Sequence, residues 1–360
     1  MYIGIIMDID KKIDIIKSEP TEEIVTIDDL KHILETNNKP KHYIGLEISG
    51  IPHIGHLFVG GKKINDLDMV GVKTNILLAD WHSVANKKLG GDWDKIKELS
   101  KFYNDLFKAF CPNANIVLGS DLYEKNDEYW KNLISTSTQV TIARATRTLI
   151  IQGRNEKDTL YVSQYIYPIM QAIDIEALDV EIPHAGMDQR RVHMLAKEIF
   201  ETRTPKRIIA PIHHHLLPSL LEPPKIESSM VKEEIVAAMK MSKSKQGSAI
   251  SILATDDEIR STIKKGWCPE RVTLENPILE LIKYVIIPNL KSFDIERKKE
   301  YGGDLNYIDY KELEMAYANG KIHPLDLKNA VANAIIKLFK QIRPVTEKYK
   351  EQVLDIMNNK

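Results

Sequence analysis

The chain has 360 residues, of which 50 are basic and 51 acidic, and its formal net charge is −1. This length allows two domains, and the near-neutral balance argues neither for nor against a nucleic-acid partner, so any basic surface must be local. The two cysteines, Cys111 and Cys268, lack metal-ligand spacing and exclude a disulfide scaffold. Because the sequence holds no run of about 18 apolar residues and its acidic start does not fit a signal peptide, we expect a soluble, cytoplasmic protein.

Helical and strand-like patterns alternate along the first two thirds of the chain. A cap at Thr26, with Asp29 three residues later, begins the first predicted helix. In chain order the predicted elements are helix 26–34, strand 42–48, helix 53–70, strand 74–80, helix 93–110, strand 114–121, helical material 124–176, and strand-like runs 179–186 and 207–212. Such alternation predicts an α/β fold with a parallel sheet, whose ligands bind beyond the carboxyl ends of the strands.

The character of the sequence changes near residue 250. The segment 218–240 is interrupted by prolines and is expected to be loop-like. From Asp256 onward the chain is charged and mainly helical, and it includes an amphipathic segment at 326–342. We therefore predict two domains, 1–250 and 251–360.

The stretch "GIPHIGHL" (50–57) places His53 and His56 at the start of a predicted helix, directly after a strand. A helix N-terminus offers free backbone N–H groups, and Gly55 would allow close approach of a ligand, so the stretch suits a phosphate group. A metal pair would need further ligands. Two capping histidines without a ligand remain the other interpretation.

A second stretch, "KMSKS" (240–244), carries two lysines and two hydroxyls in a predicted loop. Alone, such a run is usually solvated surface. Paired with "HIGH" (53–56), it resembles the signatures of class I aminoacyl-tRNA synthetases. The resemblance implies a Rossmann-type catalytic domain, ATP as substrate and Mg²⁺ on its phosphates. It also implies that ATP is held by His53, Gly55, His56, Lys240, Met241, Ser242, Lys243 and Ser244, with His53, His56, Lys240 and Lys243 acting in catalysis.

The stretch "VSQYIYPIMQAIDI" (162–175) has polar residues at helical spacing. Gln164, Tyr167, Gln171 and Asp174 share one helix face, bounded by isoleucine and methionine. A stripe of this kind suits the lining of a polar pocket, whereas an amphipathic surface helix would carry lysine or glutamate. A buried aspartate and a buried tyrosine could bind a phenol, and phenylalanine would leave them unpaired.

The whole chain resembles the archaeal and eukaryotic type of tyrosyl-tRNA synthetase, from "YIGLEISG" (43–50) through "LLADWH" (77–82), "YPIMQAIDI" (167–175) and "GMDQRRVHMLAKE" (186–198) to "YGGDL" (301–305) and "HPLDLKNAV" (323–331). The resemblance implies L-tyrosine and tRNA(Tyr) as partners. Tyr43 and Asp174 would hold the phenol hydroxyl. The amino acid's ammonium and carboxylate would be held by Tyr167, Gln171 and Gln189, and the ATP ribose would lie at Gly186 and Asp188. Gly45 and Glu47 would lie on the substrate-binding strand.

Two positions depart from the family's pattern. Ala185 stands where many members have a glycine, which affects the approach of the backbone to the ribose. Lys243 stands where archaeal members commonly have serine, and it should strengthen the grip on pyrophosphate.

The C-terminal region carries the features expected to meet tRNA. Asp326 has a local interpretation as an acid at a helix N-terminus. By resemblance it reads the guanine at the first anticodon position, between Tyr301 and His323, while Arg190 contacts the first base pair of the acceptor stem. Lysines 291, 298, 299, 321 and 328 could meet phosphates or be merely solvated.

Other interpretations remain. The run "HHH" (213–215) could suggest a metal, but adjacent side chains diverge, and we expect no metal site there. A tryptophan–tRNA ligase is the nearest alternative function. A regulatory protein that has lost aminoacylation and a small-molecule nucleotidyltransferase are further ones. The resemblance also implies a homodimer formed through about 120–165.

Overall fold

The computed structural model describes residues 7–149, 159–203, 205–223, 240–241 and 247–358. Contacts between residues divide the chain into two compact units. Unit 1 comprises Met1–Gly50, Lys63–His214 and Glu351–Lys360, and unit 2 comprises Ile51–Lys62 and His215–Lys350. The boundary near residue 250, which rests on the change in sequence character there, stays a prediction. Among the described residues, no helix combines the length and apolar character that a bilayer crossing requires.

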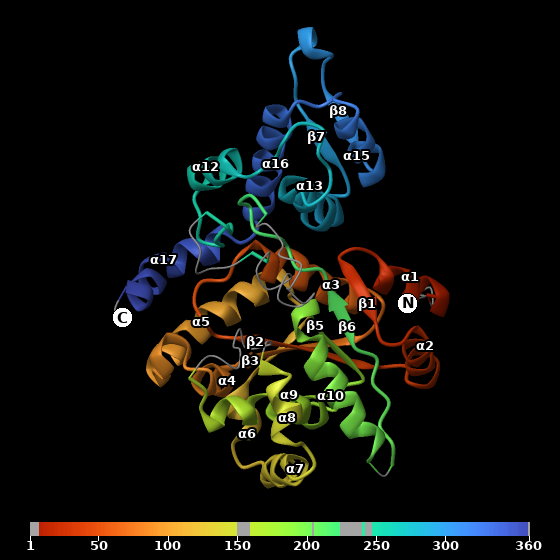
Figure 1. Ribbon diagram of the computed structural model, residues 1–360, viewed down its shortest axis with the longest axis vertical. Coiled ribbons are helices and arrows are strands. Elements are labelled where there is room, and N and C mark those ends of the chain that lie inside the picture. Colours follow the sequence, from red (N-terminus) through yellow and green to blue (C-terminus); the bar gives the residue numbers. More distant parts are fainter. Residues whose placement is uncertain (1–6, 150–158, 204, 224–239, 242–246, 359–360) are drawn as a thin grey trace, which may run out of the picture. The chain divides into compact units, whose positions relative to one another are not determined.

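Unit 1 is built on a six-stranded sheet in the order β1-β6-β5-β2-β3-β4 (Figure 1). The strands are β1 (Thr21–Ile24), β2 (Lys41–Glu47), β3 (Lys73–Ala79), β4 (Asn115–Leu118), β5 (Ile182–Gly186) and β6 (Ile212–His214). Strand β1 runs antiparallel to β6, and all the other neighbouring pairs are parallel. The predicted α/β fold with a parallel sheet is confirmed.

The helices of unit 1 connect and cover these strands. They are α1 (Ile9–Lys17), α2 (Ile27–Thr36), α3 (Lys62–Met69), α4 (Asp80–Ala85), α5 (Trp93–Phe110), α6 (Gly119–Tyr123), α7 (Asp127–Ser137), α8 (Ile142–Thr146), α9 (Val162–Ala177) and α10 (Arg190–Glu201). The predicted cap of α2 is confirmed, because Thr26 accepts from the N–H of Asp29 and the Asp29 carboxylate accepts from the N–H of Thr26. Helix α1 and strand β1 were not predicted.

The strand predicted at 114–121 is too long. It ends at Leu118, and α6 begins at Gly119. The reason is the buried Asp80 carboxylate, which accepts the backbone N–H of Ser120 at 3.0 Å and so caps the new helix. A Cβ on Gly119 would come within 2.7 Å of that carboxylate, so the turn needs glycine there.

The strand predicted at 207–212 is displaced along the chain. Regular pairing runs over Ile212–His214 instead, so two histidines of the "HHH" run lie in β6. Pro211, directly before the strand, has no N–H for a ladder bond. The preceding residues bond individually, with the backbone N–H of Ala210 donating to the carbonyl of Glu181 at 2.8 Å.

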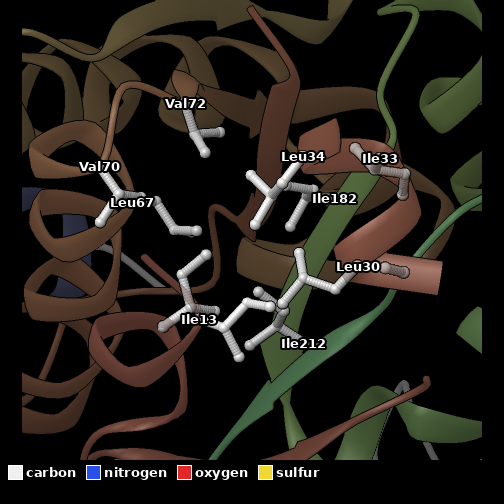
Figure 2. Close-up of a cluster of buried hydrophobic side chains, with 11 residues drawn as sticks. Ile13, Leu30, Ile33, Leu34, Leu67, Val70, Val72, Ile182 and Ile212 are labelled. Carbon is white, nitrogen blue, oxygen red and sulfur yellow. The ribbon is translucent and has the colours of Figure 1, made fainter. Parts of the chain in front are cut away.

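A cluster of buried hydrophobic side chains forms part of the core of unit 1. Figure 2 shows side chains of α1, α2, α3, β5 and β6 converging on one centre. Leu30, Leu67, Ile182 and Ile212 have no exposed surface. Each such side chain stabilises the fold by roughly 1.5–3 kcal/mol through burial. The cluster therefore fixes the helices next to the β5 and β6 strands.

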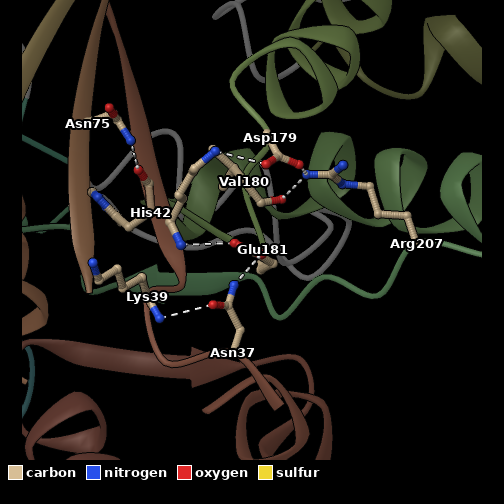
Figure 3. Close-up of polar contacts among 9 residues, drawn as sticks. Asn37, Lys39, His42, Asn75, Asp179, Val180, Glu181 and Arg207 are labelled. Atoms are coloured by element: carbon tan, nitrogen blue, oxygen red, sulfur yellow. Dashed lines mark hydrogen bonds and ion pairs between the residues drawn. The ribbon is translucent and has the colours of Figure 1, made fainter. Parts of the chain in front are cut away.

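Polar contacts pin the starts of β2 and β5 together (Figure 3). The Glu181 carboxylate accepts from the Asn37 amide and from the backbone N–H of Lys41, both at 2.8 Å. Lys41 Nζ and Arg207 both pair with Asp179, at 2.8 and 3.1 Å. Because the two strands are parallel and start in register, their carboxyl ends emerge at the same edge of the sheet.

Unit 2 is mainly helical beyond residue 255, as predicted. Its elements are α12 (Asp256–Lys265), α13 (Pro277–Leu281), α14 (Ile287–Leu290), β7 (Phe293–Ile295), β8 (Leu305–Tyr307), α15 (Tyr310–Ala318) and α16 (Pro324–Phe339), and α17 spans Arg343–Asn358. The segment predicted as one helix from His53 to 70 contains a π-helical stretch, His56–Gly61, before α3. The ring of Phe58 stacks on that of Phe339 at 5.6 Å within this unit.

Candidate active site

Helix α9 carries the predicted polar stripe in unit 1. Gln164, Tyr167 and Asp174 are buried, and Gln171 is partly exposed. Gln164 accepts the backbone N–H of Tyr161 at 2.9 Å, so it caps its own helix. On the other side, Ile169, Met170 and Ile173 pack with Tyr123, Tyr129 and Leu133. The stripe therefore faces the interior, as its composition indicated.

Asp174, which is predicted to bind the substrate phenol, already contacts three side chains of the protein. One carboxylate oxygen, Oδ1, accepts the hydroxyls of Tyr123 at 2.9 Å and Tyr129 at 3.0 Å. The other, Oδ2, lies 3.3 Å from Nε2 of His82. Burial raises the pKa of Asp174 to about 7, while the two tyrosine hydrogen bonds act to lower it. Sequence reasoning assigned no role to Tyr123, Tyr129 or His82.

Strand β2 brings Tyr43 to the same region. Tyr43 is buried, and burial together with the charge of Asp174 raises the pKa of its phenol. Two residues further on, Gly45 is exposed, so the sheet surface beside the Tyr43 ring is open. Glu47 ends the strand and accepts the Asn86 amide at 2.8 Å. Tyr43 and Asp174, predicted as a pair, thus lie close enough to interact electrostatically.

Tyr167 is buried near several carboxylates. Its pKa is raised by burial and then by the charge of Glu47, with smaller contributions from Asp174 and Asp188. The His82 ring meets the Tyr167 ring edge-on at 4.7 Å. Lys88 pairs with Glu47 at 3.3 Å. Asp174 and Asp188 add further carboxylates near Tyr167, and this set of groups suits an ammonium group.

The "GMDQ" turn follows β5 at the carboxyl edge of the sheet. Gly186 and Ala185 are buried, and Asp188 and Gln189 are partly exposed in the short 3₁₀ turn Met187–Gln189. Arg190, the first residue of α10, donates through Nε to both oxygens of Glu23 at 3.0 and 2.8 Å. Glu23 lies on the unpredicted strand β1, so this partner was missed.

In unit 2, the "HIGH" residues are held by local hydrogen bonds. Gly55 N–H donates to Nδ1 of His53 at 3.1 Å, and His53 N–H donates to Nδ1 of His56 at 3.3 Å. The neutral rings therefore carry their proton on Nε2. A Cβ on Gly55 would lie 3.0 Å from the His53 ring, so the glycine accommodates that ring in addition to its predicted role toward a ligand.

The two signature motifs share a neighbour within unit 2. Met241 N–H donates to the carbonyl of Leu217 at 2.7 Å, and the Leu217 side chain would lie 3.6 Å from a Cβ on Gly55. Lys240 pairs with Pro218 in an isolated bridge. The remaining motif residues, Ser242, Lys243 and Ser244, lie outside the described residues.

The predicted anticodon residues of unit 2 are accessible. Tyr301 is 64% exposed, and His323 is exposed and caps α16 by accepting the Leu325 N–H at 3.2 Å. Arg297 donates to the carbonyls of Gly303 and Lys321, both at 2.9 Å, and so ties the Tyr301 loop to the residues before His323. Asp326 is partly exposed in the first turn of α16.

The histidines of the "HHH" run have separate neighbours. His213 Nε2 lies 3.1 Å from Nδ1 of His193. On the other side of the ring, His213 Nδ1 lies 3.0 Å from the Glu23 carboxylate. His214 contacts His184 at 2.8 Å. His215 stacks on Tyr284 with ring centres 3.8 Å apart. In the part of the chain that the structure describes, no group of three histidine, cysteine or carboxylate residues is arranged to hold a metal.

Comparison with known proteins identifies relatives along almost the whole chain. The model of the class I tRNA synthetases (W and Y) matches residues 35–340. A tyrosine–tRNA ligase of Pyrococcus furiosus is 41% identical over 372 residues, covering 98% of this chain and 99% of its own. A tyrosine–tRNA ligase of Thermococcus onnurineus is 42% identical over 367 residues, covering 96% and 97%.

Solved structures agree. The crystal structure of a tyrosyl-tRNA synthetase from Pyrococcus horikoshii, complexed with L-tyrosine, has a TM-score of 0.90 and 38% identity, covering 98% of this chain and 100% of that one. A tryptophanyl-tRNA synthetase from Aeropyrum pernix, with a TM-score of 0.67 and 16% identity, shares the fold alone. The resemblance read from "HIGH", "KMSKS" and the longer stretches is confirmed. The chain belongs to the class I tRNA synthetases of the tryptophan and tyrosine (W and Y) family.

Proposed function

We propose that the chain is a tyrosine–tRNA ligase. Tyrosine's carboxylate attacks the α-phosphate of ATP and gives tyrosyl-adenylate and pyrophosphate; a ribose hydroxyl of the tRNA's 3′-terminal adenosine then attacks the activated carbonyl and releases AMP. The observation that carries the proposal is the buried pair of Tyr43 and Asp174. Asp174 accepts a phenol O–H, and Tyr43 donates to the phenol oxygen. The indole of tryptophan has no such oxygen, so this pair favours tyrosine.

The amino-acid end of tyrosine is held by Tyr167, Gln171 and Gln189. The carboxylates near Tyr167 support binding of the ammonium group. Glu47 and Asp188 are among them. Orientation supplies much of the acceleration, because the carboxylate is then held in line with the α-phosphate.

ATP is held by two sets of residues in the proposal. Gly186 and Asp188 bind the ribose. His53 and His56 donate Nε2–H to phosphate oxygens, because their Nδ1 atoms are occupied by backbone N–H groups. Lys240 and Lys243, with Met241, Ser242 and Ser244, grip the leaving pyrophosphate. Mg²⁺ enters with ATP as part of the nucleotide substrate.

Binding of tRNA(Tyr) is assigned to four residues. Asp326 accepts from the guanine at the first anticodon position, between Tyr301 and His323. The exposure of Tyr301 and the Arg297 bonds that fix its loop support stacking on that base. Arg190 contacts the acceptor stem, with Glu23 setting the direction of its guanidinium. We place the reaction in the cytoplasm.

Isotope exchange of pyrophosphate into ATP tests the first step. We expect exchange with tyrosine and at most a trace with tryptophan or phenylalanine. Exchange with tryptophan would make the chain a tryptophan–tRNA ligase and would contradict the roles of Tyr43 and Asp174. Lack of exchange with all three would overturn the enzymatic proposal and favour a regulatory protein with this fold.

Asp326→Asn should lower kcat/KM for tRNA charging by about 10–100-fold, the size of one lost base-reading carboxylate contact. Tyrosine-dependent pyrophosphate exchange should stay unchanged, since it needs no tRNA. Asp257→Asn is the matched control, because Asp257, like Asp326, is an acid in the first turn of a helix, here α12. An equal loss of kcat/KM in both variants would mean that Asp326 only stabilises its helix and does not read the base.

A homodimer is part of the proposal. Apolar side chains on α7, α8 and α9 are exposed, including Ile134 at 66%, Ile142 at 75% and Val162 at 77%. Exposed apolar side chains of this size favour an interface between copies. Sedimentation should give twice the 41.2 kDa chain mass, and Ile134→Asp should shift the protein toward the monomer. A monomeric wild-type chain at micromolar concentration would contradict the dimer.

A further inference from the structure

The carboxylate of Asp174 is held by two phenols of the protein itself. Asp174 is 1% exposed on α9, Tyr123 comes from the end of α6, and Tyr129 comes from α7. Both hydroxyls donate to Oδ1, at 2.9 and 3.0 Å, and their rings lie 4.4 Å apart. A carboxylate oxygen has two lone-pair sites, so these donors occupy Oδ1.

The other oxygen, Oδ2, is left with a different neighbour. Nε2 of His82 lies 3.3 Å away, from α4. Burial lowers the pKa of His82 to about 3, so the ring is neutral and adds no positive charge beside the carboxylate. Among the hydrogen bonds of the described residues, Oδ2 has none from the protein. It is therefore the carboxylate atom that remains to accept a hydroxyl from a ligand.

We infer that Tyr123 and Tyr129 are positioning residues for tyrosine recognition: by occupying Oδ1 of Asp174 they leave Oδ2 to the substrate phenol and favour the ionised carboxylate, which accepts the hydrogen bond of the phenol O–H. This inference rests on the proposed function. Tyr123 and Tyr129, which come from separate helices, orient the Asp174 carboxylate and favour its ionised form. Of the three, Asp174 alone touches the substrate.

The charges around Asp174 explain why two donors are needed. The titratable groups that interact with it are Tyr43, Asp80, His82, Tyr123, Tyr129 and Tyr167. None of these is a cation when His82 is neutral. Arg144 of α8 and Arg203 after α10, from elements beside α9, are paired with Glu198 and Glu176. Hydrogen bonds from Tyr123 and Tyr129 are thus the influences that oppose the burial of the charge.

The effect of these hydrogen bonds on tyrosine binding depends on pH. Both hydrogen bonds favour the carboxylate and lower the pKa of Asp174, which stands at about 7 with them present. Removing either hydroxyl raises that pKa. A larger fraction of Asp174 is then protonated at neutral pH, and Oδ2 accepts the substrate hydroxyl less well. The loss is largest near pH 7 and shrinks as the pH rises above the altered pKa.

The test is calorimetric binding of L-tyrosine to the full chain at pH 7 and pH 9, with Tyr123→Phe and Tyr129→Phe as separate variants. We expect roughly tenfold weaker binding at pH 7, as for loss of a hydrogen bond to a charged group, and a smaller deficit at pH 9. Discrimination against phenylalanine should fall in parallel. Tyr317→Phe is the control, since it removes a buried hydroxyl bonded to Pro269 in unit 2.

Each outcome of the binding test supports or contradicts the inference. An equal weakening at both pH values would mean that the phenols only pack, and unchanged binding would mean that they do nothing for recognition; either overturns the inference while leaving the proposed function intact. If one variant unfolds, the other gives the same comparison, because the two hydroxyls bind the same oxygen. A wild-type chain that binds no tyrosine would overturn the proposed function, and this inference with it.

Discussion

His56→Ala should lower kcat for tyrosine-dependent pyrophosphate exchange by about 10²–10³-fold, the usual cost of losing one preorganised donor to a developing negative charge. His56 Nδ1 accepts the backbone N–H of His53, so the ring proton is on Nε2, the donor in the proposal. Tyrosine binding should be unchanged, because this residue touches only ATP in the proposal. Exchange kinetics and tyrosine calorimetry together measure both quantities.

The matched control is His32→Ala, which removes an exposed histidine of α2 from unit 1. His56→Asn should recover part of the rate, since the amide still donates a hydrogen bond. A His56→Ala enzyme with unaltered kcat would show that the histidine stabilises the helix start and has no part in phosphoryl displacement.

Asp174→Asn should reduce kcat/KM for tyrosine by about 10²-fold, corresponding to roughly 2–3 kcal/mol for a lost hydrogen bond to a buried charge. Phenylalanine should suffer no such loss, because it never used the carboxylate. The ratio of the two kcat/KM values should therefore fall by the same factor. The variant should also lose the dependence of tyrosine binding on pH near 7, where Asp174 titrates.

Asp179→Asn serves as the comparison for this substitution. Asp179 follows α9 closely and pairs with Lys41 and Arg207 at the starts of the strands. Its loss should affect thermal stability and leave substrate choice unchanged. If Asp174→Asn kept full discrimination between tyrosine and phenylalanine, the phenol would have to be recognised by other groups.

Periodic patterns made much of unit 1 predictable. The stripe on α9 follows from helical spacing, and β2, β3 and β5 follow from short apolar runs between helices. Strand β1, with the sequence "TEEI", has no such signal because it is polar and lies at the sheet edge. Its pairing with β6 is decided by tertiary contacts, so Glu23 and its bond to Arg190 could not be foreseen.

The partners of Asp174 were beyond sequence reasoning for a different reason. Tyr123 and Tyr129 lie 51 and 45 residues before it, on helices with no spacing relation to α9. The link between the signature motifs is similar: Leu217 is an ordinary apolar residue that contacts Met241 through its backbone and faces Gly55 through its side chain. Local sequence identifies the reacting groups, and the packing of distant elements decides what orients them.

The course of the chain through its two units bears on experiments with shortened proteins. His53 pairs with Ser251, and Ile54 donates to the carbonyl of Ile250, so the "HIGH" segment is anchored by residues far later in the chain. Neither unit is a continuous stretch of polypeptide. A protein cut after residue 250 would keep both signature motifs and the tyrosine-binding residues yet lose half of this anchor. Failure of such a fragment to form adenylate would therefore report the loss of support for His53 and the rest of unit 2, and it would say nothing about whether the removed part binds tRNA.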